Sequence, residues 1–343
     1  MRRIMVIVLM LNVFFLSGES LSELPIDKWP RDRRIDKQVK RLAKKIEFHC
    51  KLVKGDYGAF GWDIVGVKLL YKLGEIVRNN PQKGIPSVYD IAMDRGRDRL
   101  LRGLMWEGLL DLEEEACVKA ACKFILDKSE DEILRARVIE LLGGTKDTSA
   151  TPYLIQVMED KSNPERVRWC AARAFIPIRD RRAIPCLLEL VQSEENDDIR
   201  AIAAGALGSN AYAFKDTNIT RFIIRELEEE DNWKVRMMEI ECLGCLGRVG
   251  DRRATRLLLE LARKKKDLFH VIKELGNIGT PECKEVLLQL LKDEDESIRF
   301  NAANALIKTG DKGAISEVER SLERFSSGYR EVIGKALKEA KKE

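Results

Sequence analysis

A short apolar phrase returns along this chain of 343 residues at nearly regular intervals. Its clearest copies read IRAIAAGALG, VRMMEIECLG and IRFNAANALI. The position that closes the phrase recurs every 31 to 36 residues, at Gly74, Leu110, Gly143, Ile176, Gly208, Gly244, Gly276, Ile307 and Lys338. This period is typical of solenoid proteins, in which each repeat buries its apolar face against its neighbours. The repeat therefore predicts a stack of similar structural units rather than one closed core.

Each repeat contains two helical segments, of which the phrase is the second. The first is seen in AIPCLLELVQ (183–192) and ATRLLLELAR (254–263). Thr151 and Thr280 each precede a proline, which places an N-cap side chain before a proline at the first helical position. Charged residues make up 34% of the chain and aromatic residues 6%, which fits long helices with solvated faces. We predict an all-α fold with one repeat domain over residues 62–343.

The first twenty residues differ from the rest of the chain. Arg2 and Arg3 precede an apolar run at 4–16, and small residues follow as far as Ser20. This layout is that of a secretory signal peptide. The run is shorter than the roughly 20 residues that span a membrane comfortably, which disfavours a permanent anchor. Residues 1–20 are therefore expected to be removed on export, leaving a periplasmic or extracellular protein.

Residues 21–61 are expected to form a linker and a basic N-terminal capping helix. Two prolines and many charges occupy 21–34, and apolar residues then recur at helical spacing between 35 and 54. The opposite face of this helix is basic. One interpretation is weak contact with an anionic surface. The favoured one is a cap whose outer face is solvated, as the ends of solenoids require.

An arginine recurs near the start of most second segments, at Arg102, Arg135, Arg168, Arg200, Arg236, Arg299 and Arg330. Gly66 and Leu268 take its place in the two remaining repeats. A row of arginines is one way to bind an anion. However, an arginine in the first turn of each second helix can reach acidic residues in the adjacent turn. We therefore favour a structural ladder between repeats, for which arginine is well suited.

The phrase V/I-R-x-x-A-A-x-A-L-G, followed by a turn such as RVGDRRA or KTGDKGA, resembles the short HEAT-like repeats of phycobilisome-lyase-type proteins. The resemblance covers residues 62–340. It implies a right-handed α-solenoid with the first helices on the convex side and the arginine-bearing helices on the concave side. It implies no single activity, because such repeats serve as scaffolds, adaptors, chromophore-lyase subunits and a few enzymes.

Eight cysteines in a chain expected to be exported raise the question of disulfides. Cys117, Cys242 and Cys283 occupy positions where other repeats have alanine, which favours a role as small core residues. Cys242 and Cys245 also form a CxxC motif, and a redox pair, a disulfide or half a zinc site is the alternative. No second CxxC and no histidine at ligand spacing accompanies that motif.

Catalytic motifs are absent from the sequence. A HEAT-repeat hydroxylase that modifies deoxyhypusine holds iron with His-Glu dipeptides, whereas here His49 precedes Cys50 and His270 precedes Val271. The chain contains no GxxxxGK[ST], GxSxG or HExxH motif. We therefore expect no catalytic residue, metal ion or cofactor, and we do not expect an enzyme.

Two columns of the phrase predict which residues line the concave side. The position five after the arginine has mixed charge, which disfavours a nucleic-acid channel. The position one after it carries large apolar residues, and residues four apart share a helix face. The candidate partner-binding residues are Trp169, Arg173, Met237, Glu241, Phe269, Lys273, Phe300 and Asn304. Exposed apolar side chains in a groove mark partner sites, while gap filling between helices is the alternative.

The sequence thus predicts an exported, non-enzymatic and monomeric scaffold or adaptor. Its partner is expected to be a protein or peptide, and not a nucleic acid. An accessory subunit of a chromophore- or cofactor-lyase-like enzyme is the alternative function.

Overall fold

The computed structural model describes residues 25–52 and 64–340. Within these two ranges the regular structure is helical and no β-strand occurs. The prediction of an all-α solenoid of paired helices is confirmed. The expected signal peptide, the start of the expected linker at 21–24 and all of residues 53–61 lie outside the described ranges. No helix in the described part of the chain is both long and apolar enough to cross a membrane.

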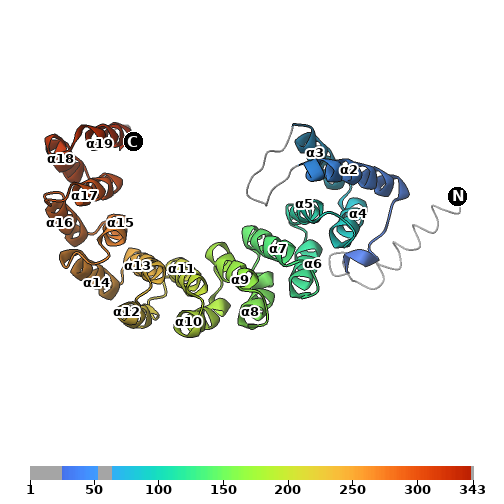
Figure 1. The fold of residues 1–343 in the computed structure, drawn as a ribbon, viewed down its shortest axis with the longest axis horizontal. Coiled ribbons are helices and arrows are strands. Elements are labelled where there is room, and N and C mark those ends of the chain that lie inside the picture. Colours follow the sequence, from blue (N-terminus) through green and yellow to red (C-terminus); the bar gives the residue numbers. More distant parts are fainter. Residues whose placement is uncertain (1–24, 53–63, 341–343) are drawn as a thin grey trace. The chain divides into compact units, whose positions relative to one another are not determined.

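The chain forms two compact units, Met1–Ile178 (unit 1) and Arg179–Glu343 (unit 2). Unit 1 starts with the short η2 (Ile26–Lys28), α2 (Arg33–Leu52) and α3 (Ile64–Asn79). Helices then alternate between two layers (Figure 1). The first helices of its pairs are α4 (Pro81–Met93), α6 (Glu115–Leu126) and α8 (Thr151–Glu159). The second helices, which carry the phrase, are α5 (Arg99–Leu110), α7 (Glu132–Thr145) and α9 (Glu165–Ile178).

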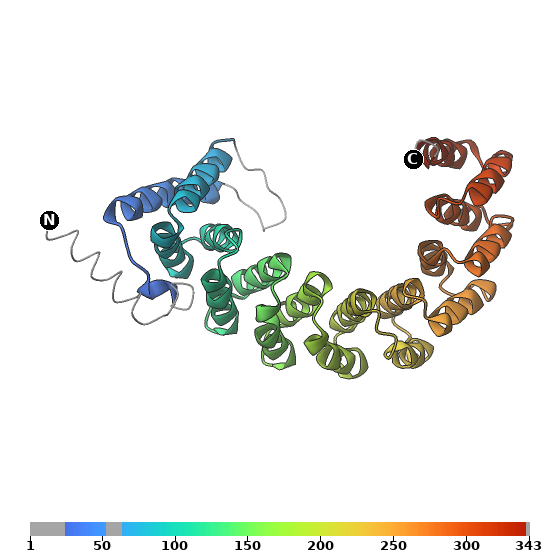
Figure 2. The same ribbon diagram turned by 180° about the vertical axis from the view of Figure 1, so that it is seen from behind.

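Unit 2 repeats this arrangement, and its two layers are also visible from behind (Figure 2). Its first helices are α10 (Ile184–Ser193), α12 (Thr220–Glu229), α14 (Arg252–Arg263), α16 (Pro281–Leu290) and α18 (Lys312–Arg320). Its second helices are α11 (Asp197–Phe214), α13 (Trp233–Arg248), α15 (Leu268–Ile278), α17 (Glu296–Lys308) and α19 (Ser327–Ala340). Short 3-10 turns are η3 (Thr148–Ala150), η4 (Arg181–Ala183) and η5 (Leu322–Arg324). In both units the second helices are called the second-helix layer below.

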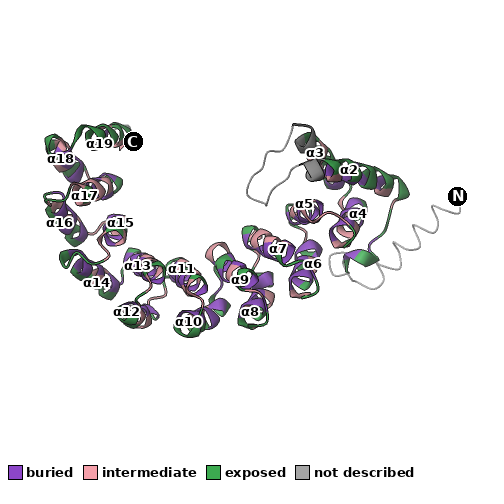
Figure 3. Cartoon of the chain, viewed as in Figure 1, coloured by how far each residue is buried: buried purple, intermediate pink, exposed green. Residues whose placement is uncertain are grey.

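The core of each unit lies between its two helix layers and between neighbouring helices of the same layer. Buried residues occupy the sides of the helices that face one another, and exposed residues occupy the outward sides (Figure 3). The closing glycine of the phrase allows neighbouring second helices to approach closely. A β-carbon at Gly208 would stand 2.8 Å from the Cα atom of Cys242, and one at Gly143 would stand 3.1 Å from that of Ala174. Backbone packing of this kind explains the closing glycine at these two positions.

The recurrent arginines link each repeat to its neighbour in unit 1. Arg102 donates to the backbone carbonyl of Ala92 at 2.8 Å and pairs with Glu130 at 2.9 Å. Arg135 in the same way donates to the carbonyl of Ile125 and to Oδ1 of Asn163, at 2.8 and 2.7 Å. Each guanidinium therefore joins the end of its own first helix to the following inter-helix turn. Arg168 donates to the carbonyl of Met158 at 2.9 Å.

Unit 2 keeps the same pattern of contacts. Arg200 pairs with Glu230 at 3.0 Å, and Arg236 pairs with Asp267 while donating to the carbonyl of Leu227 at 2.7 Å. Where Leu268 replaces the arginine, Lys265 pairs with Asp293 at 2.6 Å. Arg299 and Arg330 bind the carbonyls of Arg324 and Phe325, at 2.9 and 3.0 Å. Backbone carbonyls are thus as much a part of the ladder as acidic side chains are.

Of the two threonines predicted as N-caps, the structure confirms one. Thr280 is the N-cap of α16, and its hydroxyl accepts from the backbone N–H of Cys283 at 3.4 Å. The same prediction for Thr151 is wrong, because Thr151 is the first residue of α8 and Ala150 stands at the N-cap. The physical reason is the 3-10 turn η3, which runs directly into α8 and is itself capped by Asp147.

The cysteines are buried core residues wherever the structure describes their side chains. Seven of them carry thiols that are not in a disulfide, namely Cys117, Cys122, Cys170, Cys186, Cys242, Cys245 and Cys283. The Cys50 side chain lies outside the described part. Burial raises the pKa of the Cys117, Cys122 and Cys170 thiols to about 12, which keeps them protonated at neutral pH.

Candidate binding surfaces on the second helices

In unit 1, the predicted residue Arg173 belongs to a row of alternating charges across α5, α7 and α9. The predicted residue Trp169 lies beside this row. Arg137 pairs with Glu107 at 3.1 Å, and Arg173 pairs with Glu140 at 3.2 Å. Arg137 also lies 3.6 Å from Glu140, so the four charges form one chain of ion pairs. The Arg173 guanidinium carbon is 5.5 Å from the centroid of the half-buried Trp169 ring. One face of this tryptophan therefore already has a cation beside it.

In unit 2, the structure separates the predicted apolar residues by exposure. The Phe269 side chain is 61% exposed and lies edge-on to His270. Met237 and Phe300 are half-buried. The Phe300 ring centroid is 4.5 Å from that of Tyr329 on α19. Phe300 therefore fills the gap between two helices, whereas Phe269 is open to solvent.

The predicted polar residues of unit 2 lie one turn further along the same helices. Lys273 is 3.4 Å from Glu241 and 3.5 Å from Glu274, whose side chain is only 2% exposed. Asn304 is half-buried on α17, one turn after Phe300. Lys308 donates to Asn277 on α15 at 2.7 Å. These contacts place a band of paired polar groups beside the apolar residues.

Sequence reasoning missed Trp233, the first residue of α13, whose side chain is 66% exposed. It lies one helical turn before Met237 and so shares its face. A signal existed, because this column of the repeat is otherwise polar: Arg99, Glu132, Glu165, Asp197, Lys265, Glu296 and Ser327. Trp233, Met237 and Phe269 together are called the unit 2 apolar patch below.

A buried carboxyl group also lies on α13. Glu239 is 1% exposed and stands where three other copies of the phrase have Ala171, Ala203 and Ala302. Its Oε2 atom has no hydrogen-bond partner within the described ranges. Burial, reinforced by the charges of nearby acidic residues on and after α12, raises the pKa of this carboxyl to about 8. The group is therefore largely protonated at neutral pH.

Helix α2 has the two faces that the sequence predicts. Val39, Leu42 and Ile46 are buried, and α2 packs against α3, α4 and α5. Its basic side chains point outward and are exposed; among them are Arg34, Lys37, Arg41, Lys44 and Lys45. The role of α2 as a capping helix stays a prediction. Contact of its basic face with an anionic surface stays a prediction.

Across residues 25–52 and 64–340, no three His, Cys, Asp or Glu side chains are grouped so that they could hold a metal ion.

A family model described as HEAT repeats matches residues 120–208 and 268–338. The chain is a HEAT-repeat protein. The matched segments include second helices from both units, so the family assignment and the helix pairing agree. No curated protein matches this HEAT-repeat chain by sequence.

Several solved structures are similar to this HEAT-repeat protein over most of its length. Human deoxyhypusine hydroxylase in complex with glycerol has 17% identity and a TM-score of 0.37, over 79% of this chain and 100% of that one. The Escherichia coli protein YibA has 21% identity and a TM-score of 0.48, over 80% and 95%. The CpcE and CpcF complex of phycocyanin lyase from a Nostoc species has 19% identity and a TM-score of 0.41, over 72% and 97%.

Proposed function

We propose that this HEAT-repeat protein is a non-enzymatic scaffold or adaptor that binds a protein or peptide through the second-helix layer of unit 2. The observation that supports this most is the unit 2 apolar patch. Two of its aromatic side chains, Trp233 and Phe269, are 66% and 61% exposed. Exposed tryptophan and phenylalanine side chains gathered on one surface are the residues that anchor protein partners.

The arrangement around the patch fits this role. Trp233 and Met237 lie one turn apart on α13, and Phe269 lies near the start of the adjacent α15. A large aromatic side chain buries about 150–250 Å² when it is fully covered, so covering the exposed parts of Trp233 and Phe269 removes a large apolar area from water. The Glu241–Lys273 pair beside the patch supplies a polar rim, as protein interfaces have.

Binding is tested by capture of partners from an envelope extract of the source organism. We expect a Trp233→Ser, Phe269→Ser double variant to retain less than about a tenth of the captured partner, because each substitution removes an exposed anchor. Phe222→Ser is the matched control, since this half-buried aromatic residue lies on the first helix α12. The control should capture as the original protein does, and both variants should keep full helicity by circular dichroism.

Equal capture by the double variant and the original protein would remove the patch as the binding surface. The same experiment reports on the alternative function. A coloured or covalently modified captured protein would favour an accessory subunit of a chromophore- or cofactor-lyase-like enzyme.

We also propose that the protein acts after export. The support is the layout of residues 1–20, in which two arginines precede an apolar run and small residues. N-terminal sequencing of the protein from its source is expected to begin after Gly18 or Ser20. A chain that retains residues 1–20 would contradict export by this route.

A further inference from the structure

Helix α3 carries a copy of the phrase that closes at Gly74, so it is counted here with the second helices of unit 1. The stacking of these helices is interrupted at one place. The regular contact joins a closing glycine to the small residue six positions after the next ladder arginine, as Gly143 meets Ala174. The corresponding pair on α3 and α5 is Gly74 and Gly108. A β-carbon on Gly108 would meet nothing within 4 Å, and the nearest atoms to one on Gly74 all belong to Arg78. These two helices therefore do not touch where neighbouring second helices otherwise do.

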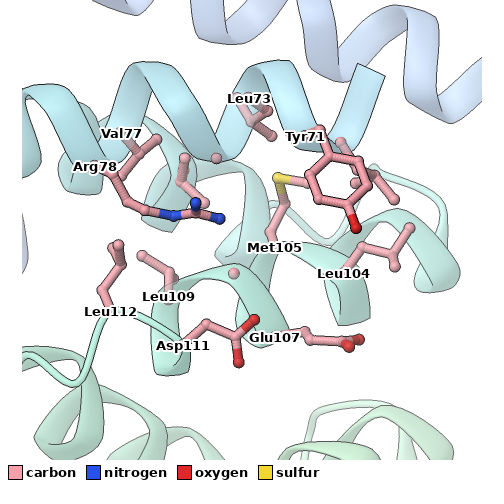
Figure 4. Close-up of a pocket in the computed structure, with 14 residues that line it drawn as sticks. Tyr71, Leu73, Val77, Arg78, Leu104, Met105, Glu107, Leu109, Asp111 and Leu112 are labelled. Atoms are coloured by element: carbon pink, nitrogen blue, oxygen red, sulfur yellow. The ribbon is translucent and has the colours of Figure 1, made fainter. Parts of the chain in front are cut away.

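The space between them is a cavity of about 290 Å³ (Figure 4). Its apolar wall comes from three helices, because α3 packs against α4 and α4 packs against α5. Leu73 and Val77 of α3, Val88 of α4, and Met105 and Leu109 of α5 line it, and all five are buried. A volume of this size lies near the lower end of small-ligand pockets and accommodates one large apolar side chain.

Two opposite charges border the cavity. Arg78 comes from the last turn of α3 and Asp111 directly follows α5, and in Figure 4 both side chains project into the space between the helices. Neither side chain forms an ion pair with the other or with any residue of the described ranges. Asp111 stands at the carboxyl end of α5, where the last carbonyl groups add negative potential and favour a cation. Glu107, a third charged residue of the lining, already pairs with Arg137.

We propose that this cavity binds a small zwitterion with a large apolar side chain, namely a hydrophobic α-amino acid or dipeptide. The apolar side chain fills the space left open at Gly108. The ligand carboxylate pairs with the Arg78 guanidinium, and its ammonium group pairs with Asp111 at the end of α5. Arg78 and Asp111 are both exposed and are solvated in the free protein. A purely anionic ligand meets the carboxylates of Glu107 and Asp111, and a purely cationic ligand meets Arg78, so a ligand of both signs is the one that pairs with both ends. This inference concerns unit 1 and does not depend on the proposed function of unit 2.

The test is isothermal titration of the mature full chain with leucine, phenylalanine, tryptophan and leucyl-leucine. Each is compared with its N-acetyl analogue, which lacks the ammonium charge, and with its amide analogue, which lacks the carboxylate charge. We expect at least one parent ligand to bind and each blocked analogue to bind at least tenfold more weakly. Arg78→Gln should weaken binding of the parent ligand at least tenfold and leave binding of the amide analogue unchanged. Asp111→Asn should also weaken binding of the parent ligand at least tenfold, and it should leave binding of the N-acetyl analogue unchanged.

Two further variants control for indirect effects. Gly108→Leu places a side chain in open space inside the cavity on a helix that tolerates leucine, so it should abolish binding while circular dichroism stays unchanged. Lys72→Gln removes an exposed positive charge from α3 outside the cavity lining and should leave affinity unchanged. The proposal is overturned if no parent ligand binds, if blocked analogues bind as well as parents, or if Arg78→Gln and Asp111→Asn have no effect.

Discussion

Replacing Glu239 with glutamine is expected to raise the free energy of unfolding by about 2–4 kcal/mol at pH 8 and to change it little at pH 5. Glu239 is 1% exposed, and its burial, with the charges of Glu226 and Glu230 nearby, raises the pKa of its carboxyl to about 8. Ionising it leaves a buried charge, which Arg236 and Arg200 offset only in part. Glutamine has nearly the same shape and never carries the charge.

The direction follows from proton linkage. The folded protein binds the Glu239 proton more tightly than the unfolded chain, whose glutamates titrate near pH 4.3. The stability that this group contributes is therefore fully present below about pH 4 and is lost as the pH rises through about 8. The glutamine variant should not lose this stability as the pH rises.

Urea unfolding from pH 5 to 9, with hydrogen exchange of the α13 amides as the local probe, measures the effect. The local probe matters because long repeat arrays need not unfold in one step. The curves of the original protein and the variant should diverge as the pH rises. Curves that stay parallel from pH 5 to 9 would show that Glu239 is already ionised in the folded protein at pH 5.

Removing the guanidinium of Arg135 by an Arg135→Ala substitution should cost about 3–5 kcal/mol of stability. Arg135 is 2% exposed and donates to the carbonyl of Ile125 and the Oδ1 atom of Asn163. Alanine leaves both buried acceptors without this donor and leaves a cavity among α6, α7 and the turn before α9. Lysine is not a conservative replacement, because its ammonium group does not reproduce the planar fork.

Arg137→Ala on the same helix is the matched control. Arg137 is half-buried and forms ion pairs with Glu107 and Glu140 at the surface of the second-helix layer. Pairs of this kind contribute about 0–1 kcal/mol, so the control should lose less than about 1 kcal/mol. Hydrogen exchange of the α7 amides and urea unfolding measure both. Similar losses for the two variants would mean that Arg135 does not join the repeats as described.

The sequence predicted the helix pairs well because their signals are local. The closing glycines and the arginine register recur within one helix, and in the copies that carry them they correspond mostly to contacts with the neighbouring repeat. Where a signal depended on the preceding turn, as at Thr151, the prediction failed. The 3-10 geometry of η3 moved the helix start by one residue and left Ala150 at the N-cap.

The exposure of the candidate surface residues could not be predicted from the sequence, because a column of the repeat gives the direction of a side chain but not what covers it. Phe269 and Phe300 share a column, yet Phe269 is open and Phe300 lies against Tyr329. The difference arises from the residue that the next repeat places opposite. Trp233 stands in a column of the repeat that is otherwise polar, and only its exposure in the structure identifies it as part of the unit 2 apolar patch.

The sequence by itself determined that this chain is an α-solenoid of HEAT repeats, since period, small residues and arginine register are properties of each copy. The tertiary structure alone decided where the repeats depart from the pattern. Gly74 and Gly108 look like an ordinary contact pair in the sequence but border a cavity, and Glu239 looks like one more charged residue but is buried. Both depend on the distance between helices of different repeats, which packing sets and no single copy of the phrase encodes.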